Sequence, residues 1–294
     1  MLARADLGRA AILLSAHYKA LSRVADRRGA DRATPAFPGQ DLRGPGDVEL
    51  IMAALDDLAA GCGPTFDDWH RRMFVDAEFS GNGLDYHDAR NSFLPHVLER
   101  KVGIPISIAV VGLELAKRIG LPMWGVGMPG HFLLGTPTNP RIRSVPDVPD
   151  VPDVPDVLDV QATSFIDPFN SGAVMDFEGC VAMHNAMFGD RQELNAAMLA
   201  PVSTELILIR MTNNLKSIYA RDRYFDGLTA VLRLRSCLPD LSLIEGCELV
   251  RLLEATGSWS EARGVLDQLL GLFYDPEAQA ILDSELNRLS ARLN

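Results

Sequence analysis

One stretch of the sequence reads Ile104-Pro105-Ile106-Ser107-Ile108-Ala109-Val110-Val111-Gly112-Leu113-Glu114-Leu115-Ala116-Lys117-Arg118-Ile119-Gly120. Its first half is apolar on every side, which predicts a helix that is buried at its N-terminus and meets water only near its C-terminus. Gly120 is a fitting C-terminal cap. We therefore expect this helix at the centre of the main domain.

Short apolar runs between turn residues follow this helix. Met123–Val126, His131–Leu134 and Ser164–Ile166 predict antiparallel strands that pack on it. A helix followed by strands is typical of an α+β domain. The sequence thus predicts an α+β core, in which a buried central helix packs on a small antiparallel sheet.

Further helices are expected before the core. Apolar positions at helical spacing indicate helices at 5–22 and 47–60, with a Pro/Gly-rich loop at 34–46 between them. The segment from Asn91 to Lys101 begins with capping residues and ends with basic ones, which predicts another helix that Gly103 stops.

The segment between the last two expected strands repeats Val-Pro-Asp from Val145 to Asp156. Frequent proline removes backbone donors and favours an extended, polyproline-like path. We expect an elongated loop over 136–163 and assign it no function.

Helical patterns continue from about residue 205 to the end of the chain. Aligning Tyr224 with Trp259 gives an offset of 35 residues, close to the ~34-residue period of tetratricopeptide repeats. A plain helical bundle is the alternative. The expected domains are N-terminal helices packing on the core at 1–65, the core at 66–195, and a tetratricopeptide-like tail at 196–294.

Composition excludes some classes of function. The 294 residues carry a net charge of −11, which disfavours binding to nucleic acid. No stretch reaches the roughly 18 to 20 apolar residues that a membrane span needs. The four cysteines show neither a disulfide framework nor paired metal-ligand spacing, and no secretory signal is expected, so the chain is predicted to be cytoplasmic with reduced thiols. The oligomeric state stays open.

The run Gly125-Val126-Gly127-Met128-Pro129-Gly130 matches the GxGxxG dinucleotide pattern. That pattern works only when a helix begins within it and points its N-terminus at the pyrophosphate. Here a proline and a strand-like run follow, so we interpret the motif as a tight turn and expect no cofactor.

The order of three features points to a catalytic type of site. A buried helix start at 103–107 precedes His131 at the mouth of a strand and Asp167 after another strand. In papain-like and transglutaminase-like enzymes a helix N-terminus lowers a thiol pKa, a histidine takes its proton, and a carboxylate orients the imidazole. The thiol is missing here, and a structural hydrogen-bonded pair is the simpler interpretation of His131 and Asp167.

Several blocks together resemble the SirB-type transglutaminase-like family of bacterial proteins. They are Phe79-Ser80-Gly81-Asn82, Asp88-Ala89-Arg90-Asn91-Ser92-Phe93-Leu94, Val97-Leu98-Glu99-Arg100-Lys101, Gly103-Ile104-Pro105-Ile106-Ser107, Pro129-Gly130-His131-Phe132-Leu133 and Ile166-Asp167-Pro168-Phe169-Asn170. The resemblance implies a papain-like fold with His131 and Asp167 in the places of the catalytic pair. The place of the usual cysteine falls at about Pro105, and family members commonly lack a thiol there too.

Two other residues are candidate nucleophiles. Ser107 lies where the helix dipole helps, although it is also a natural cap of the central helix. Cys180 follows the Asp167 loop and could fold back toward His131, although an apolar neighbourhood usually means a merely buried thiol.

A polar loop precedes the central helix. Its residues Asn82, Asp88, Arg90 and Asn91, with Pro105, are the candidate lining of a binding groove. The alternative is that Asp88, Arg90 and Asn91 lock the loop through side-chain hydrogen bonds to its backbone. Asp85, His87, His131 and Asp167 include metal-ligating types, but their spacing does not hold them together. No metal site is predicted.

Two functions remain. The first is a non-catalytic, protein-binding or regulatory module whose groove surrounds His131 and Asp167, with a protein or peptide partner. The second is an acyl-transfer or amide-hydrolysing enzyme that uses Ser107 or Cys180 as nucleophile. Loss of the thiol favours the first.

Overall fold

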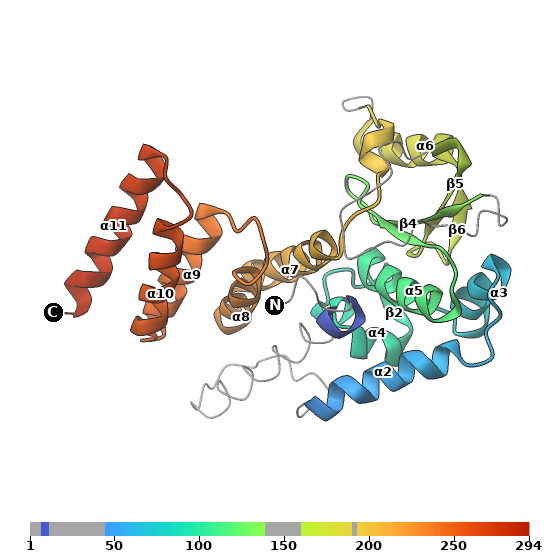
Figure 1. The fold of residues 1–294 in the computed structure, drawn as a ribbon, viewed down its shortest axis with the longest axis horizontal. Helices are drawn as coiled ribbons and strands as arrows, with labels where there is room; N and C mark the ends of the chain where they lie inside the picture. The colour runs from blue at the N-terminus through green and yellow to red at the C-terminus, as the bar shows by residue number, and fades with distance from the viewer. Residues whose placement is uncertain (1–6, 12–44, 139–159, 190–192, 294) are drawn as a thin grey trace. The chain divides into compact units, whose positions relative to one another are not determined.

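The computed structural model describes residues 7–11, 45–138, 160–189 and 193–293. Figure 1 shows the elements along the chain. The described residues form two compact units, the first ending at Met211 and the second starting at Thr212. This division falls inside helix α7 (Thr204–Arg221), whereas the sequence placed the boundary after residue 195.

The first unit contains the helices expected before the sheet, together with α3 (Phe66–Arg71) and α6 (Phe177–Phe188), which the sequence did not predict. The expected helices are α2 (Pro45–Ala59), α4 (Leu94–Arg100) and α5 (Pro105–Ile119), and there are short helical turns η2 (Arg72–Asp76), η3 (Ala89–Ser92), η4 (Val160–Ala162) and η6 (Ala196–Leu199). Residues 7–11 are also helical. The rest of the helix expected over 5–22, most of the loop at 34–46 and residues 139–159 of the Val-Pro-Asp segment lie outside the described residues.

Helix α5 is the buried central helix that the sequence predicts. Every residue from Pro105 to Gly112 is buried, and Gly120 ends the helix in the left-handed conformation at φ 71°. The lack of a side chain at Gly112 lets Trp69 pack closely, and the Trp69 Nε1 donates to the Gly112 carbonyl at 2.9 Å. The long apolar run therefore forms the interior of this unit.

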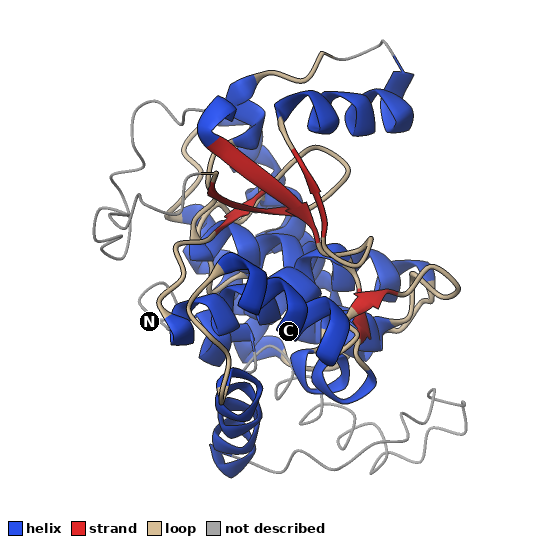
Figure 2. Cartoon of the chain, turned by 90° about the vertical axis from the view of Figure 1, so that its right-hand side faces the viewer, coloured by secondary structure: helices blue, strands red, loops and turns tan. Residues whose placement is uncertain are grey.

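A four-stranded antiparallel sheet follows α5 in the chain. Its strands are β3 (Trp124–Val126), β4 (Leu133–Pro137), β5 (Thr163–Asp167) and β6 (Ala173–Met175), in that spatial order. The first three correspond to the predicted strands, and β6 is an addition. The sheet lies between α5 and α6 (Figures 1 and 2), and α6 packs on β5 and β6.

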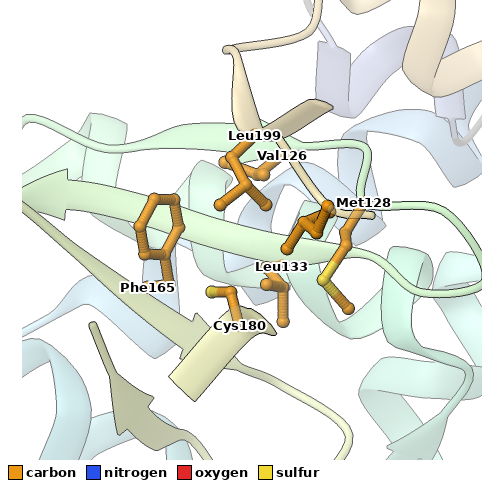
Figure 3. Packing of buried hydrophobic residues seen from close by; sticks show 7 residues of the cluster. Val126, Met128, Leu133, Phe165, Cys180 and Leu199 are labelled. Atoms are coloured by element: carbon orange, nitrogen blue, oxygen red, sulfur yellow. The ribbon is translucent and has the colours of Figure 1, made fainter. Parts of the chain in front are cut away.

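Successive side chains of β4 point to opposite faces of the sheet. Leu134 faces α5, where it approaches Gly112. Leu133 faces the other way and joins an apolar cluster beneath α6 (Figure 3). The buried members of that cluster are Val126, Met128, Leu133, Phe165, Cys180, Leu194 and Leu199. The hydrophobic pattern at the start of β4 thus decides which side chain points toward α5 and which points toward α6.

A second, small sheet joins the polar loop to the start of α5. Strand β1 (Ser80–Gly81) pairs in parallel with β2 (Val102–Gly103), and Asn82 continues the ladder by donating its N–H to the Gly103 carbonyl. Helix α4 ends at Arg100, and the next residue, Lys101, caps it in the left-handed conformation. The helix expected from Asn91 to Lys101 is therefore divided into η3 and α4.

The second unit consists of helices in its described part. After the end of α7 come α8 (Phe225–Arg235), α9 (Leu243–Ala255), α10 (Trp259–Leu270) and α11 (Pro276–Leu293). Helices α9, α10 and α11 pack against one another, and ion pairs such as Arg251–Glu285 connect α9 to α11. None of the described helices combines the length and apolar character needed to cross a bilayer.

Candidate functional site

The imidazole of His131 and the carboxylate of Asp167 meet at one end of the β4–β5 hairpin. Because Leu134 pairs with Ile166, the start of β4 lies beside the end of β5. Asp167 Oδ1 accepts a hydrogen bond from His131 Nε2 at 2.9 Å. The Asp167 side chain is fully buried, whereas 12% of the His131 side chain is exposed. The structure therefore brings the two residues together as a pair that is open to solvent on the histidine side.

Asp167 is held by more than the histidine. Its Oδ1 also accepts from the backbone N–H groups of Phe169 (2.9 Å) and Asn170 (3.3 Å), and its Oδ2 accepts from Asn170 Nδ2 at 2.5 Å. Burial acts to raise the pKa of Asp167, but the hydrogen bond and charge of His131 and the Asn170 and Phe169 donors outweigh it. The net effect lowers the pKa, so the carboxylate stays ionised and fixes the imidazole.

Two glycines allow the Asp167 loop to pack closely. Gly172 has φ 75°, its N–H donates to the Asp167 carbonyl, and a side chain there would collide with Phe74. Gly81 donates its N–H to the Phe169 carbonyl, and a Cβ there would lie 2.3 Å from the Phe169 ring. Strand β1 thereby holds Phe169, whose ring meets the His131 ring edge-on at 6.4 Å.

The glycine-rich motif is a turn that presents His131. The His131 N–H donates to the Met128 carbonyl at 3.0 Å, Pro129 follows Met128, and Gly130 has φ 72°, as in a type II turn. Strand β4 follows it. Gly125 makes room for the ring of Phe132, which explains another glycine of the motif by packing. A dinucleotide site would need a helix at this point.

Two residues that the sequence did not single out lie at the site. Arg210 of α7 donates from Nη2 to the His131 carbonyl at 2.8 Å and to the Met128 carbonyl at 3.5 Å. The ring of Tyr86 lies 5.8 Å from that of Phe169, and its phenol interacts electrostatically with Arg210. Burial raises the pKa of Tyr86, and the positive charge of Arg210 only partly offsets this rise. The Phe169 ring therefore contacts the imidazole, Tyr86 contacts Phe169, and the guanidinium binds the main-chain carbonyl of His131.

The hydroxyl of Ser107 forms hydrogen bonds with main-chain groups around the start of α5. It is fully buried, with the carbonyl of Asn91 at 2.5 Å and that of Ile104 at 3.0 Å as acceptors. It also accepts the N–H of Ile104 at 3.1 Å, which is the position of a helix cap. These contacts favour a capping role for Ser107 and do not connect it with His131.

Cys180 lies on the face of α6 that packs against the sheet. Its side chain is fully buried in the apolar cluster of Figure 3. Burial, with smaller contributions from the charges of Asp176 and Asp167, raises its pKa to about 12. A nucleophilic thiol needs the opposite shift, because the thiolate is the reactive form.

The polar loop 82–92 is held mainly by its own side chains. Buried Asn91 donates to the Asp85 and Tyr86 carbonyls at 2.7 and 3.3 Å, and it accepts from Asn82 Nδ2 at 3.1 Å. Asp88 caps η3 and forms an ion pair with Arg90 at 2.7 Å. Burial acts to raise the pKa of Asp88, but the Arg90 contacts lower it below its usual value. The candidate groove residues of this loop thus fix its shape, which leaves Leu84 and Tyr86 exposed.

Pro105 is the first residue of α5 and is buried. At this position a proline suits a helix, because its missing N–H would have no partner within the helix. Among the described residues, no three His, Cys, Asp or Glu side chains are grouped so that they could hold a metal ion. The chemistry that this arrangement offers is hydrogen bonding and proton exchange at the imidazole.

Comparison with known proteins gives the family. Residues 53–213 match the transglutaminase-like superfamily. A UPF0162 protein of Xylella fastidiosa (strain 9a5c) is 32% identical over 212 residues, which cover 69% of this chain and 66% of that protein. A UPF0162 protein of Pseudomonas aeruginosa is 32% identical over 178 residues, covering 59% and 54% of the two chains. The matched part is thus between about half and two thirds of these relatives.

A more distant likeness reaches animal proteins. Human F-box only protein 21 is 29% identical over 150 residues, which are 51% of this chain but 21% of that protein. No solved structure matches the chain. The superfamily match covers more than half of the sequence and includes both members of the His131–Asp167 pair. The chain belongs to the transglutaminase-like superfamily.

Proposed function

We propose that this protein is a non-catalytic binding module, in which the surface around His131 and Asp167 docks a segment of another protein. One observation carries the proposal: the imidazole is oriented and partly exposed, while the two candidate nucleophiles are engaged elsewhere. The hydroxyl of Ser107 bonds to main-chain groups, and the thiol of Cys180 is buried with a pKa of about 12. An imidazole held in this way is a hydrogen-bonding group for a ligand.

The surroundings suit a peptide. Leu84 is fully exposed and Tyr86 is 42% exposed, on a loop whose backbone is held by buried Asn91. Aromatic side chains on a preformed surface supply much of the energy in protein interfaces, because little conformational entropy is lost when they are covered. The rings of Tyr86, Phe169 and His131 follow one another in edge-on contacts, so a docked chain would meet them in sequence.

The helical tail supports the same type of role. Helix α10 begins at Trp259, 34 residues after α8 begins at Phe225, which matches the ~34-residue period of tetratricopeptide repeats. Repeats of this kind present extended surfaces to other proteins. We therefore also propose that the protein is a SirB-type bacterial protein and that it is cytoplasmic. We propose further that its tail is tetratricopeptide-like.

The test is a selection followed by a binding measurement. Phage-displayed random dodecapeptides are selected on the full chain, and the enriched peptides are synthesised with a fluorescent label for anisotropy titrations. We expect His131→Ala and Tyr86→Ala each to weaken binding by about tenfold or more, since a central aromatic contact is typically worth more than 1 kcal/mol. Tyr274→Ala, an exposed tyrosine in the second unit, is the matched control and leaves binding unchanged.

The alternative is an acyl-transfer or amide-hydrolysing enzyme. This enzyme would use His131 and Asp167 with Ser107 or Cys180 as the nucleophile. The contacts of Ser107 and Cys180 give this function less support. Mass spectrometry of the selected peptides after incubation with the protein separates the two functions. Intact peptides agree with a binding module. Cleaved or acylated peptides that depend on His131 would overturn it.

A further inference from the structure

Arg210 is a partly buried cation without a carboxylate partner among the described residues. Its hydrogen bonds there go to the carbonyls of His131 and Met128, both from Nη2. Several other arginines of the described part have an acidic partner, as Arg90 has Asp88 and Arg118 has Glu114. A guanidinium that has lost part of its hydration without meeting an opposite charge is ready to bind an anion.

The guanidinium is held in one place. Its central carbon lies 5.3 Å from the centroid of the Phe132 ring, in a cation–π contact. A Cβ built on Gly127 would lie 2.9 Å from Nη1, so the glycine leaves the space that the guanidinium fills. Burial lowers the pKa of Arg210, and the phenol of Tyr86 only partly offsets this shift. The group is therefore positioned by packing and backbone contacts alone.

The unused edge of this guanidinium is suited to a carboxylate. Nε and Nη1 make no hydrogen bond to a described residue, and a guanidinium presents its N–H groups as a planar fork that matches a carboxylate. Arg210 bonds to the His131 carbonyl, and its charge acts on the ionisation of the Tyr86 phenol. Tyr86 in turn contacts Phe169 beside the imidazole, so the cation belongs to the same surface.

We propose that Arg210 binds a carboxylate of the segment that docks beside His131, so that the site selects acidic peptides. This inference rests on the proposed binding function and adds the chemical class of the ligand. The glycine at position 127 and the turn at Met128–His131 then serve a common purpose, because both hold the guanidinium against the main chain of His131.

The experiment uses the same dodecapeptide library with the full-length chain. Selections on the wild type and on Arg210→Gln are compared for their content of Asp and Glu. We expect enrichment of acidic residues on the wild type and its loss on Arg210→Gln. Arg263→Gln, which removes an exposed arginine of α10, is the matched control and keeps the enrichment.

If Arg210→Gln loosened the turn at Met128–His131, it would weaken binding for a reason unrelated to the carboxylate. A double-mutant cycle separates this effect from the loss of the contact with the carboxylate. The acidic residue of a selected peptide is replaced by its amide, Glu by Gln or Asp by Asn. We expect this to weaken binding to the wild type by about tenfold, and binding to Arg210→Gln by less than about twofold. Gly127→Ala displaces the guanidinium without removing its charge, and we expect it to give an intermediate loss.

The outcomes separate the two proposals. Peptides that need Tyr86 and His131, yet bind equally well as acids and amides, would overturn the role of Arg210 and leave the binding function standing. An equal loss in the wild type and in Arg210→Gln would do the same. Failure to select any peptide, or binding that ignores His131 and Tyr86, would overturn the binding function and this inference with it.

Discussion

The start of α5 and the end of the β4–β5 hairpin both hold buried polar side chains, but they use them differently. At the start of α5 the Ser107 hydroxyl both donates to and accepts from main-chain groups. At the hairpin Asp167 collects four hydrogen bonds, whereas His131 gives it only Nε2 and keeps part of its ring exposed. A polar group remains available for a ligand only where the fold leaves one of its atoms without a structural partner.

The largest effect should come from removing the carboxylate. Asp167→Ala leaves His131, Phe169 and Asn170 with donors that have lost their acceptor in a buried place, so we expect the free energy of unfolding to fall by about 3 to 5 kcal/mol. Urea unfolding measures it. Asp267→Ala, on an exposed residue, is the control and should change stability by less than about 0.5 kcal/mol. A loss below about 1 kcal/mol for Asp167→Ala would mean that the hairpin end is less organised than its contacts indicate.

The Asp167→Ala variant should also change how the free energy of unfolding depends on pH. The pKa of Asp167 is lowered in the folded protein, so its contribution to stability is present above the ordinary carboxyl pKa of about 3.9 and is lost as pH falls through the folded value. We expect the difference in unfolding free energy between wild type and Asp167→Ala to shrink as pH falls from about 5 to below about 4. A difference that stays constant down to pH 3 would contradict the shifted carboxylate.

A smaller effect is expected at the start of α5. Ser107→Ala removes the cap of the Ile104 N–H and a donor to the Asn91 carbonyl, which should cost about 1 to 2 kcal/mol of unfolding free energy. Peptide affinity should not change. Ser217→Ala, an exposed serine on α7, is the control. A variant of normal stability that loses peptide binding or turnover would show that Ser107 belongs to the functional site after all.

The smallest effect is expected at Cys180, whose thiol should not react with an alkylating reagent. A thiol with a pKa of about 12 is ionised in roughly one molecule in 10,000 at pH 8, and the folded protein covers it completely. Iodoacetamide at pH 8 should therefore modify exposed Cys237 and leave Cys180 untouched, as peptide mass spectrometry can show. Equal rates at the two cysteines would place a reactive thiol near the His131–Asp167 pair.

Much of the core could be predicted from local signals. The apolar run of α5 with its cap at Gly120, the first three strands of the sheet and the turn at Gly130 all depend on neighbours within a few residues. The strand β6 was missed because Val174 is exposed and the segment carries no alternating pattern. Residues 139–159 and most of the first expected helix lie outside the described part of the chain, so those predictions stand untested.

The site could be predicted only in part. His131 and Asp167 follow from the order of helix and strands, since antiparallel neighbours bring a strand start to a strand end. Arg210 could not be predicted, because it lies 79 residues from His131 and its sequence context is that of an ordinary amphipathic helix. Tyr86 lies in a segment that was recognised as polar, and its contact with Phe169 joins residues far apart in the sequence, where Gly81 of β1 also bonds to the Phe169 carbonyl.

The sequence by itself determined the α+β core, the family resemblance and the position of the histidine and the carboxylate, because each rests on local periodicity or on a short motif. Only the tertiary structure decided the roles of Ser107, Cys180 and Arg210. Their chemistry depends on which backbone groups, apolar side chains or charges lie within a few ångströms. Those neighbours come from distant parts of the chain and are brought together by packing.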